Sequence, residues 1–510
     1  MPGLRAAALA LLASVSLSPR AQTALTSPSP EAGGAFGYSV AGIGDVDGDG
    51  VRDVLVGAPG ESHDAVVGAG RVYIMSGATQ ASIRTLTSPT PIADGAFGFA
   101  VDAAGDLNSD GTPDVLVGAP GESDGGLARA GKAYVLSGSN GAVIRTFSAL
   151  DLWEDAQLGY DVARVGDQNG DGTNDHIVGA PGSQGFQDNP RGVDAGAAYV
   201  FNGASASVLA VTYAGGSGRR LGTSVGGGDF DANTLSGYVV GSPLNGAGTV
   251  TQTTDARSLT VYRAPDGVAR FGQSLDVIGD RDNMSMADVV IGSEDGVFVY
   301  AGSDGGLLVS LVSPDGPGDG FGFAVSGAGN VDEEGAGDLI VGAHLAPRGA
   351  TPEAGRVFLF TGDDGDLLYS LTSPNPVEGG HFGHAVALAG EIDDDNTADQ
   401  IVGAPGEDVD GQSDAGRAYL LLSATVVANE EAPGEVLALT SSPNPARSTL
   451  RLGTGAGGTL TVVDALGREV HRAETRGEIT LDVSEWAPGA YHVRLATEAG
   501  TVARSVTIVR

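Results

Sequence analysis

The chain has 510 residues, with 64 acidic and 27 basic side chains and a formal net charge of −37. This charge disfavours nucleic acid and anionic membranes as partners, because binding to either requires a basic surface. The chain has no cysteine, which excludes disulfides, thiol catalysis and zinc–thiolate sites.

Residues 1–21 have the pattern of a secretory signal peptide. Arg5 precedes an apolar run from Ala6 to Leu17, and Ser-Pro-Arg-Ala follows, with a small residue at Ala21. The run is too short to span a bilayer, and no other segment is long enough. We therefore expect an exported protein, secreted or held at a bacterial cell surface, without a transmembrane segment.

The segment from Asp45 to Asp53 places acids at alternating positions 45, 47, 49 and 53. Glycines at 48 and 50 permit the tight curvature that turns these side chains inward, while Val51 can offer only its backbone carbonyl. Carboxylates and a carbonyl form the all-oxygen cage that Ca²⁺ prefers. A single such segment could equally be a solvated turn, but it recurs.

Seven repeats share one layout. Each has a Phe-Gly or Leu-Gly pair, then the acidic loop, then a Gly-Ala-Pro-like triplet such as Gly57-Ala-Pro59. They begin near residues 36, 97, 158, 221, 271, 321 and 382, separated by 61, 61, 63, 50, 50 and 61 residues. Periods of this size indicate a repeat architecture.

Short segments rich in Val, Ile and Tyr lie between these markers. In repeat one they are residues 38–46, 53–57, 71–76 and 83–87. Four short strands in each of seven repeats predict an all-β fold, a seven-bladed β-propeller with four-stranded antiparallel blades.

These repeats resemble FG-GAP repeats, the blades of the amino-terminal propeller of integrin α chains. Phe36-Gly37 and Gly57-Ala-Pro59 match the motif that names the family, and residues 45–53 match its Ca²⁺ loop. The resemblance covers roughly residues 23–423. It implies that each metal loop joins the first and second strands of a blade, on the lower face of the disc.

We expect about five Ca²⁺ sites, in blades one, two, three, six and seven. Their predicted ligands are Asp45, Asp47, Asp49, Val51 and Asp53; Asp106, Asn108, Asp110, Thr112 and Asp114; Asp167, Asn169, Asp171, Thr173 and Asp175; Asn330, Asp332, Glu334, Ala336 and Asp338; and Glu391, Asp393, Asp395, Thr397 and Asp399. Repeat five has Met284 at the third ligand position, which leaves its occupancy open. Repeat four ends in Gly237, so we expect no metal there.

The ring needs a strand to close it. Leu25-Thr-Ser-Pro28 lies eleven residues before Phe36, the same phase that Leu86-Thr-Ser-Pro89 has before Phe97. Repeat seven lacks its fourth strand, so we infer that residues 24–28 complete blade seven. Residues 437–440 are a rival candidate. The propeller would then span residues 22–424.

A polar linker at 425–436 leads to a second domain at 437–510, which has the pattern of a small β-sandwich. Strand-like segments occur at 459–464, 479–483 and 489–495, with a turn at Gly467. This domain resembles the carboxyl-terminal sorting domain of type IX secretion through Pro443-Asn-Pro445, the segment 463–467, Gly489-Ala-Tyr491 and a basic terminus. The resemblance implies contact with the secretion machinery; a fibronectin-like adhesive module is the alternative.

The connection after each Gly-Ala-Pro triplet lies on the upper face, opposite the metal loops. It is long in blades six, seven, one, two and three, which form one continuous arc, and short in blades four and five. We expect an extracellular protein or glycan to bind this arc. Candidate contacts are Glu61, Asp64, Glu122, Asp124, Arg129, Asp188, Arg191, Glu407 and Asp408.

The sequence favours a ligand-binding scaffold over an enzyme. No phosphate loop, nucleophile elbow or Ser/His/Asp arrangement is present. Two alternatives stay open: a polysaccharide lyase or hydrolase that uses the upper face, and a structural surface-layer protein stiffened by Ca²⁺.

Overall fold

The structure is a computed structural model. It describes residues 21–149, 153–186, 189–190, 192–230, 237–244, 248–254, 258–281, 286–332, 335–395, 397–422, 439–442, 448–464, 468–497 and 500–508. Several predicted features lie outside these residues: the signal peptide to residue 20, the linker, Pro443-Asn-Pro445, the Gly467 turn, and the loop residues Asp188, Arg191, Met284 and Glu334.

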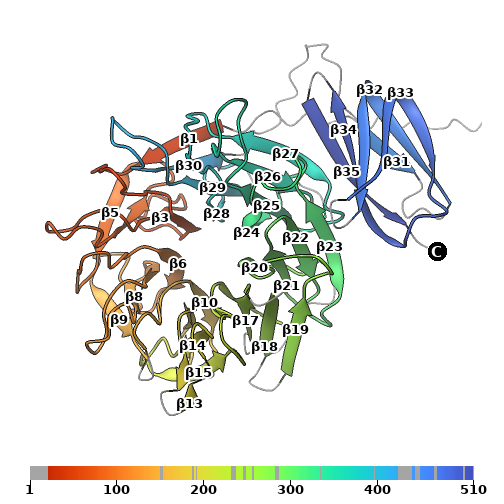
Figure 1. Cartoon of the computed structure of the whole chain (residues 1–510). Coiled ribbons are helices and arrows are strands. Elements are labelled where there is room, and N and C mark those ends of the chain that lie inside the picture. The colour runs from red at the N-terminus through yellow and green to blue at the C-terminus, as the bar shows by residue number, and fades with distance from the viewer. Residues whose placement is uncertain are drawn as a thin grey trace, which may run out of the picture.

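Seven four-stranded antiparallel sheets form a ring (Figure 1), which confirms the predicted all-β propeller. The first three blades are built from β2 (Ser39–Gly42), β3 (Val54–Ala58), β4 (Arg71–Met75) and β5 (Ser82–Thr87); from β6 (Ala100–Gly105), β7 (Asp114–Ala119), β8 (Lys132–Leu136) and β9 (Val143–Phe147); and from β10 (Val162–Gly166), β11 (Asp175–Ala180), β14 (Ala197–Phe201) and β15 (Val208–Tyr213).

The remaining blades follow the same order from the central channel to the rim. They comprise β16 (Val225–Gly228), β17 (Gly237–Ser242), β18 (Thr249–Thr254) and β19 (Ser258–Arg263); β20 (Ser274–Ile278), β21 (Asp288–Gly292), β22 (Gly296–Tyr300) and β23 (Leu307–Val312); β24 (Phe321–Gly329), β25 (Asp338–Ala343), β26 (Arg356–Phe360) and β27 (Leu367–Thr372); and β28 (Ala385–Gly390), β29 (Asp399–Ala404) and β30 (Arg417–Leu422).

The ring is closed by the first strand of the chain. β1 (Ala21–Thr26) pairs antiparallel with β30 over six residues, from Ala21 opposite Leu422 to Thr26 opposite Arg417. Leu25 of this strand is buried between blades seven and one. The rival segment instead contributes β31 (Leu439–Ser442) to the second domain.

The Phe-Gly and Gly-Ala-Pro motifs meet across each blade boundary. A Cβ added to Gly57 would lie 2.1 Å from the carbonyl oxygen of Gly98 in the next blade, and the other six boundaries repeat this contact. The preceding Phe36 and Phe97 are fully buried. The glycines therefore let adjacent blades approach closely, and the aromatic rings fill the space between them.

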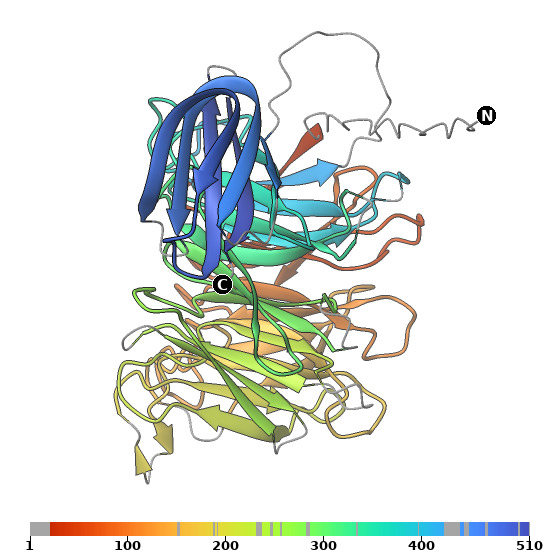
Figure 2. The ribbon, with the colours of Figure 1, turned by 90° about the vertical axis from the view of Figure 1, so that its right-hand side faces the viewer.

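The second domain consists of β31, β32 (Thr449–Asp464), β33 (Glu469–Asp482), β34 (Gly489–Thr497) and β35 (Gly500–Ile508). The long strands β32 and β33 pair in two stretches interrupted by an irregularity between Gly453 and Gly457, and β31 and β34 pair with opposite halves of β32. Buried Leu450, Leu460 and Val493 belong to one core. The domain contacts the propeller rim through β34 against β23 and β35 against β27 (Figures 1 and 2).

Candidate functional site

The described acidic loops follow the inner strands of their blades, and loops one and three share one internal geometry. In loop one, Oδ1 and Oδ2 of Asp45 accept the backbone N–H groups of Gly48 and Gly50 at 2.7 and 2.9 Å. Asp49 accepts the N–H of Val51 at 2.8 Å. The same bonds recur in loop three, from Gly170 and Gly172 to Asp167 at 2.7 Å each. The first acid thus holds the tight turn that the glycines permit.

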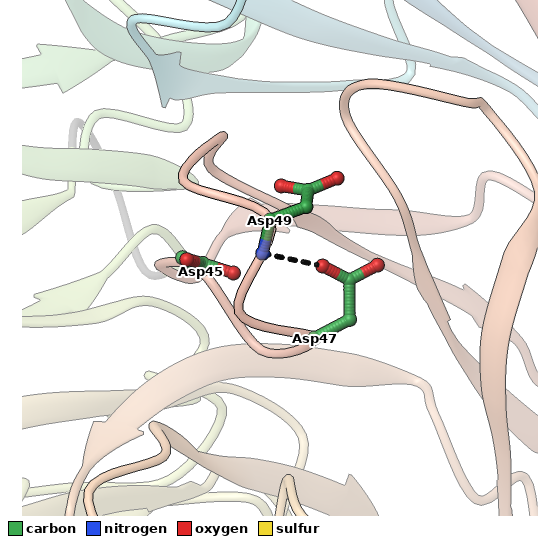
Figure 3. Close-up of side chains that lie close together, drawn as sticks. All are labelled: Asp45, Asp47 and Asp49. Atoms are coloured by element: carbon green, nitrogen blue, oxygen red, sulfur yellow. Dashed lines mark hydrogen bonds between the residues drawn. The ribbon is translucent and has the colours of Figure 1, made fainter.

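The first three acids of loop one lie together. Carboxylate oxygens of Asp45, Asp47 and Asp49 all fall within 4.8 Å of one another (Figure 3), and those of Glu391, Asp393 and Asp395 do the same in loop seven. In loops two and three the second position is Asn108 or Asn169, whose amide oxygens accept the N–H of the third acid at 2.8 and 2.9 Å.

The last acid of each loop is placed differently from its neighbours. Asp53 is fully buried, and its two oxygens accept the N–H groups of Val46 and of Gly77, in the turn after β4, at 2.7 and 3.1 Å. Burial raises the pKa of Asp53 to about 6, and the nearby charges of Asp47 and Asp49 contribute to this increase. Asp114, Asp175, Asp288 and Asp338 make the same pair of bonds. This acid ties its loop to the blade, even in blade five.

The oxygen donors fit a hard divalent cation. Loops one and seven each gather three carboxylates at the spacing of a metal cage. In loop seven, Oδ2 of Asp395 is buried and has no hydrogen-bond partner among the described residues. A bound cation would provide a partner for this oxygen. The pKa of Asp393 is raised by burial and also by repulsion from Asp395 and Glu391, and a cation would offset that repulsion.

The upper face carries a feature that sequence reasoning missed. The residue after each Phe-Gly or Leu-Gly pair lines a cavity of about 230 Å³ at the channel mouth; these residues are Tyr38, Phe99, Tyr160, Thr223, Gln273, Phe323 and His384. They precede the inner strands, whereas the acidic loops follow them, so the two features lie at opposite ends of those strands.

The aromatic residues of this mouth form a continuous arc, which we call the aromatic collar. Ring centroids lie 4.8 Å apart for Tyr38 and Phe99, and 4.9 Å for Phe99 and Tyr160. His384 lies 4.7 Å from Tyr38 and 5.1 Å from Phe323. The collar therefore belongs to blades six, seven, one, two and three, while blades four and five contribute polar Thr223 and Gln273.

The long upper loops are regular hairpins. Paired bridges form their tips in blades one, two, six and seven; they join His63 to Val66, Asp124 to Leu127, Arg348 to Thr351, and Val409 to Gln412. Positive φ angles at Asp64 and Ala65, and at Gly125 and Gly126, match the two-residue turns of such hairpins. In blade three, β12 (Gly185–Phe186) pairs with β13 (Asn189–Pro190).

Three of the predicted surface contacts are wrong. Glu61, Glu122 and Glu407 are at most 1% exposed and accept hydrogen bonds from the hydroxyls of Tyr73, Tyr134 and Tyr419. Ser88 and Ser373, which directly follow the outer strand of the preceding blade, donate to the second and third of these acids. Ser27, which follows β1, donates to Tyr73. Burial raises the pKa of Glu61 and Glu407.

These buried clusters lock blades seven to one, one to two and six to seven. Each has a cation beside the acid: Arg71, Lys132 or Arg417, at 3.9, 3.8 and 3.5 Å. A sequence signal was present, because the serine lies 34 residues before the glutamate and the tyrosine 12 after it in all three repeats. The other described candidates, Asp64, Asp124, Arg129 and Asp408, lie at the surface or partly exposed, and Arg129 pairs with Asp155 at 3.0 Å.

The channel also holds three carboxylates, those of Asp102, Asp161 and Asp276. Each accepts the N–H of the next blade's inner strand: Arg164 at 2.9 Å, Val225 at 2.7 Å and Gly327 at 3.0 Å. Burial raises the pKa of Asp161 to about 7, and the charges of Asp102 and Asp276 contribute to this increase.

Stability in chelator should therefore fall between pH 6.5 and 8. The folded pKa of Asp161 lies above its unfolded value of about 3.9, so the native state binds more protons and loses that advantage as pH rises. The expected loss is on the order of 1 kcal/mol, measured by denaturant unfolding. The Asp161→Asn variant should show a shallower decline; an equal slope in both proteins would contradict the assignment.

Among the described residues, no helix has the length and apolar character needed to cross a membrane.

Two family models match the chain, in three segments. The FG-GAP repeat model matches residues 36–75 and 97–136, and the secretion system C-terminal sorting domain model matches residues 442–509. Both agree with the resemblances drawn from the sequence.

Curated relatives match parts of the chain. Integrin alpha-5 of Xenopus laevis is 32% identical over 220 residues, covering 41% of this chain and 20% of that protein. Integrin alpha-7 of Homo sapiens is 35% identical over 153 residues, covering 28% and 12%, and integrin alpha-V of Gallus gallus is 33% identical over 182 residues, covering 34% and 16%. The matches thus span a fifth or less of those relatives.

Among solved structures, BBS1N in complex with ARL6DN aligns over 80% of this chain and 99% of its own, with 14% identity and a TM-score of 0.44. The fold assignment itself rests on the strand pairing above. The chain therefore carries FG-GAP repeats similar to those of integrin α chains, followed by a secretion system C-terminal sorting domain that indicates type IX export to the cell surface or exterior.

Proposed function

We propose that this protein is an exported Ca²⁺-binding propeller that binds an extracellular protein or glycan through its upper face, as an adhesion scaffold. The main support for this proposal is that three features lie in the same five blades. The aromatic collar, the long upper hairpins and the fullest sets of metal ligands all belong to blades six, seven, one, two and three.

The chemistry of this arc suits recognition. Aromatic rings offer large contact area at low entropic cost, and a rigid hairpin loses little freedom when a partner binds. Exposed apolar side chains on these loops include Val67 and Val193, at 67% and 64% exposed. The buried interblade clusters hold the hairpin bases in place, so the tips are presented on a fixed frame.

The Ca²⁺ would be held at the lower end of the same blades. Asp45, Asp47 and Asp49 would supply carboxylate oxygens in loop one, and Asp53 would tie the loop to the blade. The remaining predicted ligands would act likewise in loops two, three, six and seven. The ions would neutralise crowded acids and rigidify the hairpins that carry the collar.

The partner-binding proposal is tested by screening the full chain against acidic glycans and matrix proteins, with Ca²⁺ and with chelator. For any ligand found, Val67→Asp should weaken binding roughly tenfold, because it places a charge at the exposed edge of the arc. Leu244→Asp, on the short loop of blade four, is the matched control and should have no effect. Equal effects of the two variants would contradict the proposal that the partner binds the arc of long upper loops.

A second test shortens two of the long upper loops and must spare the buried glutamates. Replacing only residues 63–66 and 124–127 by Gly-Gly removes two hairpin tips and retains Glu61 and Glu122. Release of soluble products from a polysaccharide in the same screen would instead favour the enzyme alternative.

A further inference from the structure

The five fullest acidic loops contact one another around the lower face. At each of four junctions, the residue just before the last acid of one loop lies against a glycine of the preceding blade. That glycine directly precedes the first predicted ligand of its own loop. These pairs are Asn174 with Gly105, Pro113 with Gly44, Arg52 with Gly390, and Ala398 with Gly329. They connect blade three to two, two to one, one to seven, and seven to six.

A side chain at any of these glycines would force the neighbouring loop to shift. A Cβ on Gly105 would lie 2.7 Å from Nδ2 of Asn174, and one on Gly390 would lie 2.4 Å from Cδ of Arg52. Gly105, Gly329 and Gly390 also have φ angles of 85°, 71° and 94°, which other residues rarely adopt. The glycine is thus fixed both by its own backbone and by the neighbouring loop.

Both sides of each contact are joined to metal-loop residues. Gly105 directly precedes Asp106, the first predicted ligand of loop two. Asn174 directly precedes Asp175, whose oxygens accept the N–H groups of Gln168 and Gly203 at 2.8 and 2.9 Å. Within loop one, the carbonyl of Gly44 also accepts the N–H of Asp53 at 3.1 Å. Ordering one loop therefore restrains the first ligand of the loop before it.

From these contacts we propose that Ca²⁺ binding to the five loops is positively cooperative. The coupling between neighbouring loops passes through the residue before the last acid. This rests on the Ca²⁺ binding proposed above. An ion that orders one loop removes part of the ordering entropy that the next ion must overcome, which raises affinity without any new ligand. Couplings of this kind begin at roughly fivefold in affinity.

The contact chemistry differs between junctions. Asn174 offers an amide and Pro113 a rigid ring, whereas Arg52 places a cationic side chain beside the glycine that precedes Glu391. The Asn174 junction is the best to test, because shortening this side chain alters no predicted ligand of loop two or three.

The test is Ca²⁺ binding to the full chain by equilibrium dialysis with radioactive Ca²⁺. The wild type should give a Hill coefficient above 1. Asn174→Ser should bind the same number of ions, with the product of the affinities of loops two and three lowered roughly fivefold. Ala287→Gly is the matched control, because Ala287 occupies the same position in blade five. It faces blade four, whose loop lacks the last acid, so Ca²⁺ binding should not change.

Reciprocity supplies a second check, because coupling between two sites acts equally in both directions. Asp171→Ala should lower the affinity of loop two, and Asp110→Ala that of loop three, by the same factor; Asn174→Ser should abolish both effects. Binding to independent sites in the wild type, unchanged by Asn174→Ser, would overturn the coupling and leave Ca²⁺ binding standing. Absence of any Ca²⁺ binding would overturn both proposals.

Discussion

A chain that begins at residue 29 should lose the cooperative unfolding transition shown by a chain that begins at residue 21. The deletion removes all six residue pairs between β1 and β30 and leaves an open edge on blade seven. It also removes Leu25 from the core between blades seven and one, and Ser27 from its bond to Tyr73. Denaturant unfolding and size-exclusion chromatography would measure the loss and any resulting aggregation.

A point variant separates strand packing from mere chain length. Leu25 is 1% exposed, so Leu25→Ala should lower the free energy of unfolding by about 2–5 kcal/mol. Ala24 in the same strand is exposed, and Ala24→Ser should have little effect. If the chain that begins at residue 29 unfolds at the same denaturant concentration as the longer one, β1 does not close the ring.

Chelation should lower the melting temperature by roughly 5–10 °C. At millimolar Ca²⁺, a site with a dissociation constant near 10⁻⁴ M contributes on the order of 1 kcal/mol, and about five sites add up. A propeller of this size shifts by only about 1–2 °C per kcal/mol, because its unfolding entropy is large. Scanning calorimetry with EDTA, and again after Ca²⁺ is restored, would measure the shift and its reversal.

Variants in three loops provide the control for chelation. Asp49→Ala, Asp110→Ala and Asp171→Ala together remove one predicted ligand from each of loops one to three, and these side chains are exposed. The triple variant should lose about three fifths of the EDTA response. A melting temperature unaffected by chelator in the wild type would refute a stabilising role for the metal.

The propeller could be predicted because the same signals recur in register. Phe36-Gly37 and Gly57-Ala-Pro59 mark contacts that every blade must make, since the two glycines of adjacent blades meet backbone to backbone. Blade order and the four-stranded sheets follow from such local signals. The first inner strand is shorter than the predicted segment 38–46, because it ends at Gly42 and residues 43–46 already belong to the loop that follows.

The buried glutamates show where such reasoning fails. Glu61 lies in a polar loop, and its role in joining two blades becomes clear in the structure, where it accepts from Tyr73, which in turn accepts from Ser27 of the neighbouring blade. Burial of a carboxylate requires partners from other strands, and those partners are far apart in the sequence. The repeat spacing contained this information, but only as a correlation between three separate motifs.

The collar escaped detection for a different reason. Its members share a position in the repeat but not a residue type, as Tyr38, Phe99 and His384 illustrate. A search for recurring residues passes over a position whose identity varies, although variation beside a fixed motif is what a binding surface on a repeated scaffold requires. The contacts between neighbouring acidic loops could not be predicted either, because each joins a side chain of one blade to the backbone of the next.

Counting bound ions tests the central claim most directly. Equilibrium dialysis of the full chain at millimolar Ca²⁺ should give about five ions per chain, and about two in the Asp49→Ala, Asp110→Ala and Asp171→Ala variant. No bound Ca²⁺ in the wild type, or an equal number in wild type and variant, would contradict the assignment of the acidic loops as metal sites.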